Sequence, residues 1–281
     1  MPLDHVADPA IGWRASLALG FERRGARTVL ATRRHDGPLV VQKALHPEGD
    51  APCHAIVVHP PAGIAGGDHL AIEVRAGEGA AALLTTPGAG KWYRSAGPWA
   101  RQQVALHAAR DARIEWLPQE TIVFDGARAD ISLEAHLEAD ARLIAWDIVC
   151  LGRSGAGERF DSGHCRLSTR LYRDGRLAWW ERGRIEPRSR VAASHAGLAR
   201  HPVFATLIIA APAIDDAWLA AARAVPPRDG IAGITRLPGV LLARFRGDSS
   251  EAARAWCTEV WASLRMEVLG WPVSEPRIWR T

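Results

Sequence analysis

The segment Thr86–Lys91, with the sequence Thr-Pro-Gly-Ala-Gly-Lys, contains the residue types of a phosphate-binding loop. In such a loop, backbone N–H groups and a lysine hold phosphates, and a Ser or Thr after the lysine binds Mg²⁺. The chain has Thr85 where the motif needs its first glycine, and Trp92 where it needs the Ser or Thr. Because both defining positions fail, the sequence does not predict nucleotide binding.

A second glycine cluster, Gly63–Asp68, follows a pair of prolines and lacks the spacing of a dinucleotide-binding loop. A cluster of this kind is typical of a tight corner with positive φ between two strands. The side chain of Asp68 either caps that corner or faces a ligand. The sequence leaves these two alternatives open.

Histidines and cysteines, the usual ligands of transition metals, are scattered along the chain. Neither His-x-x-x-His nor His-Glu-x-x-His spacing occurs, so the sequence does not indicate a catalytic zinc site. Cys53 precedes His54 and His164 precedes Cys165, but neighbours on a strand point to opposite faces and rarely bind one metal together. The sequence also lacks a Gly-x-Ser-x-Gly nucleophile elbow. We interpret these histidines as surface or core residues.

Acidic side chains stand inside two distinctive blocks. Glu120 and Asp125 lie in Trp116–Ala127, and Glu158 lies in a glycine-rich turn beside Arg159. Glu158 either forms an ion pair with Arg159 or faces an interior cavity. Since positioned carboxylates can perform acid–base catalysis, a hydrolase or metalloenzyme of unknown substrate that uses these groups is one alternative function.

Carboxylates within apolar blocks also fit a path for a metal ion in transit. Such ions favour oxygen and imidazole ligands, and weak binding lets them leave again. An open path suits this purpose better than a closed tetrahedral site. The carboxylates that could line the path are those of Asp68, Glu120, Asp147 and Glu158.

The composition is that of an ordinary globular protein. The formal net charge of +4 in 281 residues comes almost wholly from arginine, since Lys43 and Lys91 are the only lysines. The arginines do not interleave with aromatic residues as a nucleic-acid platform would, so we expect no nucleic-acid partner. No window of about 18 consecutive apolar residues occurs, and we expect no membrane partner.

Cysteine usage and the N-terminus indicate a compartment. The four cysteines form no Cys-x-x-Cys pair, which favours reduced thiols. Met1–Gly12 lacks the basic and apolar regions of a signal peptide. We therefore expect a cytoplasmic protein.

Short strands are predicted over the first three-quarters of the chain. Apolar and polar residues alternate in 70–75, 131–137 and 165–171, so each segment has one buried and one wet face. Residues 141–150 form a longer apolar run, typical of a strand buried on both faces. Turn signals separate the runs at Asp36-Gly37, Asp125-Gly126 and Asp174-Gly175. The pattern predicts a sandwich, a barrel or a stacked-sheet solenoid, and no fixed repeat decides among them.

Helical signals gather towards the C-terminus. Residues 215–225 are alanine-rich and end before Pro226. Asp248 and Glu251 have the spacing of a capping pair at the start of a second helix. One face of that helix is apolar: Ala253, Trp256, Val260, Trp261, Leu264 and Val268. This face is expected to pack on the sheets or, alternatively, to dock a partner. No linker divides the chain, so we expect one domain, 1–281.

Four ordered blocks and the closing residues together resemble one family, the urease accessory proteins of the UreD/UreH type. The segments that carry this resemblance are His59–Asp68, Thr85–Ser95, Leu117–Ala127, Gly152-Arg153 with Gly157–Phe160, and Pro276–Thr281. The resemblance covers almost the whole chain, which makes it more specific than any single motif. One departure is Ala62, where the family tends to have a glycine.

The resemblance implies a mainly β fold, with stacked sheets of helical β (solenoid-like) topology and a few α-helices towards the C-terminus. It implies a protein with no catalytic residues of its own and no permanently bound cofactor. Its partners would be the urease apoprotein and a UreF-type accessory protein, which in turn recruits the UreG-type GTPase that delivers nickel.

The resemblance also implies a water-filled tunnel that carries nickel towards the urease active site. Polar residues inside apolar blocks are the candidates for lining this nickel path: Asp68, Thr85, Thr86, Glu120 and Glu158. A purely structural partner, which reshapes the urease apoprotein while no nickel passes through it, is a further alternative.

Overall fold

The computed structural model describes residues 12–280. The expected absence of a signal peptide rests on residues 1–11 almost entirely, and these lie outside the described residues. Thr281, the last residue of the C-terminal motif, lies outside them as well.

A seven-stranded sheet forms one layer of the molecule. Its strand order is β15 (Arg176–Ile185), β14 (His164–Arg173), β12 (Arg128–Leu137), β9 (Ala100–Ala108), β6 (His69–Ala76), β1 (Arg14–Arg24) and β2 (Arg27–Asp36). Neighbours from β14 to β1 run parallel, whereas the edge strands β15 and β2 are antiparallel to theirs.

An eleven-stranded sheet forms the second layer. Its main path is β17 (Ile231–Leu237), β18 (Val240–Gly247), β16 (Val203–Ala210), β13 (Arg142–Leu151), β10 (Arg113–Trp116), β7 (Ala81–Thr85), β4 (Cys53–Val58) and β3 (Val40–Leu45). A short parallel ladder of β5 (Gly63–Ile64), β8 (Gly90–Trp92) and β11 (Thr121–Val123) joins this path where β11 pairs with β13.

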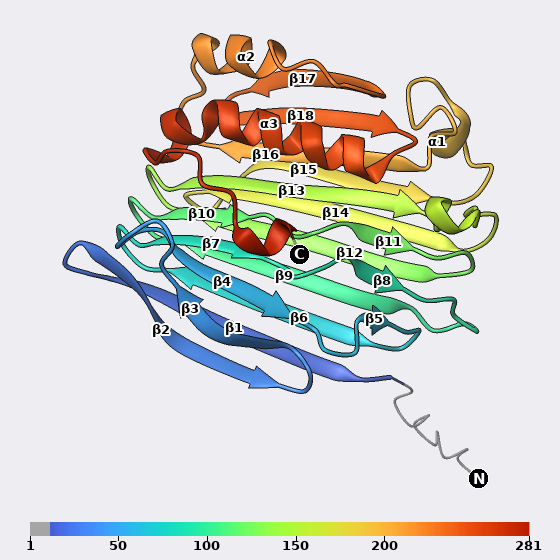
Figure 1. Ribbon diagram of the computed structural model, residues 1–281, viewed down its shortest axis with the longest axis horizontal. Coiled ribbons are helices and arrows are strands. Elements are labelled where there is room, and N and C mark those ends of the chain that lie inside the picture. The colour runs from blue at the N-terminus through green and yellow to red at the C-terminus, as the bar shows by residue number, and fades with distance from the viewer. Residues whose placement is uncertain (1–11, 281) are drawn as a thin grey trace.

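The chain winds between the two sheets. Strands β6, β9 and β12 of the seven-stranded sheet alternate along the sequence with β7, β10 and β13 of the eleven-stranded sheet. Each turn of this path adds one parallel strand to each sheet, as the order of colours in Figure 1 shows. This is the helical β topology that the resemblance implies, so the solenoid-like expectation is confirmed.

Strand alternation fills the space between the sheets. On β12 every second residue, such as Ile131 and Leu133, is buried and faces inward, as predicted. On β13, Leu143 and Val149 join this inner core, whereas Trp146 belongs to a second core on the far side of the sheet. The prediction that residues 141–150 form a strand buried on both faces is therefore confirmed.

Helix α3 (Ser250–Leu269) covers the outer face of the eleven-stranded sheet (Figure 1). The apolar face predicted for it is buried there. Its N-cap differs from the prediction: Ser249 Oγ accepts a hydrogen bond from Ala252 N at 3.1 Å, whereas Asp248 contacts His201 at 2.9 Å. The cap belongs to Ser249 because its hydroxyl stands three residues before the N–H it satisfies.

The other helices are short. They are α1 (Arg190–Ala193), α2 (Asp216–Arg223) and the 3₁₀ turns η1 (Ser154–Ala156) and η2 (Arg277–Arg280). Helix α2 begins after its cap Asp215 and ends before Pro226, which confirms the helix predicted there. Within residues 12–280, no helix combines the length and the apolar character that a membrane span requires.

The C-terminal turn η2 packs against the outer face of the eleven-stranded sheet. The ring of Trp279 lies 5.3 Å from that of Trp146 and 5.7 Å from that of Trp261, between centroids. Its indole Nε1 donates a hydrogen bond to Thr85 Oγ1 at 2.8 Å. The family-like C-terminus is therefore part of the second core.

Candidate functional site

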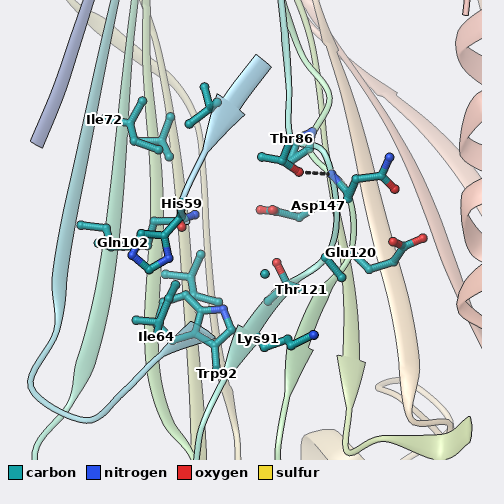
Figure 2. Close-up of a pocket in the computed structure, with 18 of the residues that line it drawn as sticks. His59, Ile64, Ile72, Thr86, Lys91, Trp92, Gln102, Glu120, Thr121 and Asp147 are labelled. Carbon is teal, nitrogen blue, oxygen red and sulfur yellow. Dashed lines mark hydrogen bonds between the residues drawn. The ribbon is translucent and has the colours of Figure 1, made fainter. Parts of the chain in front are cut away.

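A cavity of about 170 Å³ lies between the two sheets, beside the short ladder of β5, β8 and β11. Its wall on the seven-stranded sheet is formed by residues such as Ile72 and Gln102. Its opposite wall comes from the eleven-stranded sheet and the loops after β7 and β10, which supply Thr86 and Glu120 (Figure 2). A cavity between two otherwise apolar sheet faces is the natural place for a small ion or ligand.

Asp147 is the acidic side chain that points into this cavity (Figure 2). It lies on the inner face of β13, between the core residues Ala145 and Val149. Its carboxylate makes no hydrogen bond or ion pair with any residue in 12–280 and faces the cavity instead. Burial raises the pKa of Asp147 to about 7, because no positive charge compensates its lost hydration.

A second cavity, of about 550 Å³, lies between β14–β15 and β16–β18. Asp147 and Leu133 line both cavities. The Asp147 carboxyl therefore stands where two internal spaces meet. Together the cavities extend through the interior from the short ladder towards β17.

Glu120 lines the first cavity, but its carboxylate turns away from it (Figure 2). Oε1 accepts a hydrogen bond from Arg254 Nε of α3 at 2.6 Å. The two terminal nitrogens of Arg254 are buried and have no partner within the described residues. Glu120 is therefore held by a guanidinium whose other donors are unsatisfied, an arrangement that costs free energy.

The neighbouring residues Thr85 and Thr86 occupy different environments. Thr86 lines the cavity, and its hydroxyl accepts a hydrogen bond from Gln119 N at 2.9 Å (Figure 2). Thr85 faces the second core, where its hydroxyl donates to Leu117 O at 2.6 Å and accepts from Trp279. The structure thus places only Thr86 of this pair at the cavity.

Asp68 lies in the corner between β5 and β6 and holds that corner in place. Its two carboxylate oxygens accept hydrogen bonds from Trp13 N at 2.7 Å and from Ala65 N at 2.8 Å. Gly67, within the same corner, has φ of +101°. Of the two alternatives left by the sequence, the geometry favours the turn-capping role.

Glu158 also belongs to a loop rather than to the cavity wall. Its carboxylate accepts a hydrogen bond from Asp125 N at 3.1 Å and pairs with Arg153 at 2.6 Å, not with the adjacent Arg159. Hydrogen bonds from Arg153 keep the pKa of Glu158 below its ordinary value. Asp125 in turn accepts hydrogen bonds from the backbone at 161 and 162.

Sequence reasoning did not identify several polar residues at the cavity: His59, Lys91, Gln102, Gln119, Thr121 and Ser132. Burial lowers the pKa of His59, although the nearby carboxylate of Asp68 opposes that effect. A signal for Gln102 exists in the sequence, because it occupies an inward position of β9 between Ala100 and Val104. A polar residue at an inward position of an alternating strand marks such a cavity.

Comparison with known proteins decides the family. The family model described as "UreD urease accessory protein" matches residues 14–280. The chain belongs to the UreD family. Relatives named "Urease accessory protein UreD" include one from Azoarcus sp. (strain BH72), 54% identical over 99% of this chain and 96% of the relative. Another, from Dechloromonas aromatica (strain RCB), is 54% identical over 96% of this chain and 95% of the relative. One from Pseudomonas aeruginosa (strain PAO1) is 50% identical over the same shares.

The chemistry available to this UreD-family chain follows from the side chains at the cavity. In residues 12–280, no group of three or more His, Cys, Asp or Glu side chains could hold a metal ion together. A divalent cation in the cavity would meet the carboxylate of Asp147, the imidazole of His59 and otherwise hydroxyl, amide and water oxygens. Such a set binds a hard or borderline cation weakly.

The hydrolase alternative requires Glu120, Asp125 or Glu158 to act in acid–base catalysis. Glu158 and Asp125 both have pKa values below their ordinary ones; for Asp125, burial acts to raise the pKa, but hydrogen bonds from Ser162 and Asp161 outweigh it. Glu120 is paired with Arg254. These three carboxylates hold loops and α3 in place, and their geometry does not favour general acid catalysis.

Proposed function

We propose that this chain is a non-enzymatic maturation factor that supports nickel insertion into urease. Membership of the UreD family implies a role in urease maturation, and its relatives are named as accessory proteins. In the proposed complex, the chain binds the urease apoprotein and a UreF-type protein. Through the latter it meets the UreG-type GTPase. Nickel is cargo in this scheme and not a resident cofactor.

The conduit version of this function is the one that the site supports best. The observation that carries it is Asp147, an interior carboxylate at the junction of two cavities that has no partner among residues 12–280. An unpaired carboxyl in a protein interior costs folding free energy. A functional role for the group explains why this position is acidic when its neighbours Ala145 and Val149 are apolar.

The protonation of Asp147 suits a transient ligand. With its pKa raised to about 7, the carboxyl keeps its proton to a higher pH than an ordinary aspartate does. Nickel must displace the proton to bind, and the proton returns when nickel leaves. The competition keeps binding weak, which is what passage through a path requires.

The remaining candidates have graded roles in this proposal. Thr86 and Glu120 line the first cavity with Asp147, and Glu120 could add a second carboxylate if it left Arg254. The other three candidates would act indirectly: Asp68 fixes a corner, Thr85 belongs to the second core, and Glu158 holds a loop. Their contact with nickel stays a prediction.

The decisive experiment is co-expression of urease with its accessory proteins, including the Asp147→Asn variant of this chain. We expect purified urease to contain markedly less nickel, while the variant still co-purifies with the urease apoprotein. Asp161→Asn is the matched control, because Asp161 has a side chain 74% exposed to solvent. It should leave nickel content unchanged.

Two other results would select other functions. Full nickel occupancy with Asp147→Asn would refute the conduit and favour a scaffold that only reshapes the urease apoprotein. Failure of the wild-type chain to bind either the urease apoprotein or a UreF-type protein would refute the maturation role itself.

A further inference from the structure

The two sheets end unevenly at one side of the molecule. The seven-stranded sheet stops at β15, whereas the eleven-stranded sheet continues through β16, β18 and β17 (Figure 1). The cavity of about 550 Å³ lies at this step. We call this space, bounded by β15 on one side and by β16–β18 on the other, the β15 groove. The shorter sheet has no strand to place over β17 and β18, and the segment 191–198 around α1 borders the groove, where Arg246 donates hydrogen bonds to His195 O and Gly197 O.

Apolar surface is uncovered in the β15 groove. Ile231 on β17 is paired with Arg246 of β18, which is paired with Phe204 of β16, so these three side chains share the inner face of the sheet. Phe204 is partly buried against the inner core, but Ile231 is 53% exposed. The inner face of the eleven-stranded sheet therefore extends beyond the part that the seven-stranded sheet covers.

Strand β15 has features of an edge that receives another strand. It is ten residues long, and it exposes Leu177 and Trp180. Proteins normally blunt a free edge with charges, bulges or a covering element, since its unpaired N–H and C=O groups can pair with another chain. The charges on β15 are mainly those of Arg176, Arg182 and Arg184, so they oppose pairing with a second copy of this strand but not with an acidic segment.

The charges beside β15 define what would bind there. Arg182 stacks on Trp180, with its guanidinium carbon 4.5 Å from the ring centroid, and it has no ion-pair partner in residues 12–280. Arg170 lies over the same ring at 5.2 Å. Across the groove, Arg244 of β18 pairs with Glu181 of β15 at 2.9 Å, and both side chains are partly exposed. Arginine and tryptophan are the residues that most often carry binding energy in protein interfaces.

We propose that β15 and its groove form a docking site for an extended, acidic segment of a partner protein. The segment adds to β15 as the next strand of the seven-stranded sheet. Its carboxylates contact Arg182 on one face and compete with Glu181 for Arg244 on the other. An apolar side chain of the segment covers Ile231. The inference rests on the proposed function, because the partner is one of the urease-maturation proteins.

Docking at this place would also act on the conduit. The Glu181–Arg244 pair spans from one sheet to the other at the cavity that reaches Asp147. A partner carboxylate that binds Arg244 breaks its ion pair with Glu181, which removes this link between the two sheets. It also adds negative charge at the opening of the β15 groove. A cation would then meet a favourable potential at this opening only when the partner is bound.

The test uses a double charge reversal, Arg182→Glu combined with Arg244→Glu. Its control is the charge reversal Arg24→Glu, at an exposed position of β1 in the seven-stranded sheet. Dissociation constants are measured for purified urease apoprotein and, separately, for a purified UreF-type protein. We expect the double variant to bind one of them about ten- to a hundred-fold more weakly, with a reduced dependence on salt. The control should bind as the wild type does.

Hydrogen exchange of the wild-type complex provides a readout that does not depend on any variant. Those amides of 176–185 that do not already pair with β14 should become protected when the partner binds, because strand addition pairs them. Unchanged exchange in this segment, or a double variant that binds both proteins normally, would overturn the inference while the maturation role stands. Absence of any wild-type binding would refute that role and the inference together. Binding to anionic phospholipid vesicles that the double variant loses, with protein binding intact, would assign the arginines to a lipid surface instead.

Discussion

Arg265 on α3 and Glu115 on β10 form an ion pair at 2.9 Å in which the side chains are 0% and 1% exposed. A second carboxylate, Glu48, contacts the same guanidinium at 2.6 Å. Trp261 Nε1 adds a hydrogen bond to Glu115 at 2.6 Å. The desolvation of these charges is offset because nearly every donor and acceptor in the cluster has a partner.

Removing the cation from this cluster should destabilise the fold strongly. Arg265→Met leaves Glu115 buried without its counter-charge and Glu48 with His54 alone, so we expect a loss of about 3–5 kcal/mol in the free energy of unfolding. Urea unfolding followed by circular dichroism measures it. The control is Arg24→Met, whose ion pair with Glu22 is exposed and should contribute nothing measurable. Equal midpoints for the two variants would contradict the role assigned to the cluster.

The stability of the protein should depend on Asp147 as the pH rises. Burial raises the pKa of Asp147 to about 7, whereas an aspartate in an unfolded chain titrates at about 3.9. The folded state therefore holds a proton that the unfolded state has lost. The contribution of this group is fully present below the unfolded pKa and disappears as the pH rises through the folded pKa.

Asp147→Asn removes that dependence. The variant should gain stability relative to the wild type between about pH 5 and about pH 8, because only the wild type must then bury a charge. Unfolding midpoints in urea at the two pH values measure the gain. With the exposed Asp161→Asn as the reference, a difference between variant and wild type that does not change with pH would show that Asp147 is not buried as described.

The C-terminal turn should contribute to stability through one side chain. Trp279→Ala removes ring contacts with Trp146 and Trp261 and the hydrogen bond to Thr85. Since Trp279 is only partly buried, we expect a loss of about 2–3 kcal/mol, below the usual range for a fully buried tryptophan. Arg277→Ala, an exposed neighbour on the same turn, should change little. Identical unfolding curves for both variants would mean that the turn does not dock on the sheet.

The departure from the family at Ala62 should be mildly destabilising. Ala62 has φ of +61°, a left-handed conformation that costs an L-residue about 1–2 kcal/mol. Ala62→Gly relieves this cost but loses about 0.5–1 kcal/mol of backbone entropy, so we expect a net gain of about 0.5 kcal/mol. The control is Ala178→Gly at an exposed position of β15. It relieves no left-handed conformation, so it should only lower the stability of the protein. A melting temperature that falls in both variants would contradict the explanation.

Strands and helices could be predicted where the signal is local. The alternation in 131–137 and 165–171 follows directly from which face of β12 and β14 is buried. The choice between a sandwich and a solenoid could not be predicted from the residues alone, because it depends on pairing between strands about a coil apart, such as β9 with β12. Only the family resemblance supplied that topology.

The candidate site could be predicted in part. Asp147 is visible in the sequence as an acid within an apolar run, but its lack of partners depends on two sheets meeting around a cavity. Thr85 and Thr86 are adjacent in sequence, yet Thr85 reaches the second core and Thr86 the cavity, because β7 ends at Thr85 and Thr86 belongs to the loop that follows. Asp68 and Glu158 have the residue type of metal ligands, but backbone N–H groups that the sequence does not reveal occupy their oxygens.

The distance along the chain between Glu48 and Arg265, 217 residues, has a consequence for biosynthesis. Each coil pairs with the coil before it, so the sheets can assemble in order while the ribosome is still at work. Glu48 and Glu115 then stay hydrated and unpaired until Arg265, near the C-terminus, is translated. The outer face of the eleven-stranded sheet stays uncovered during the same interval. Translation of α3 is therefore the step that commits the chain to its closed form, and a prematurely terminated product would present both unpaired acids and bare apolar surface to the quality-control machinery of the cell.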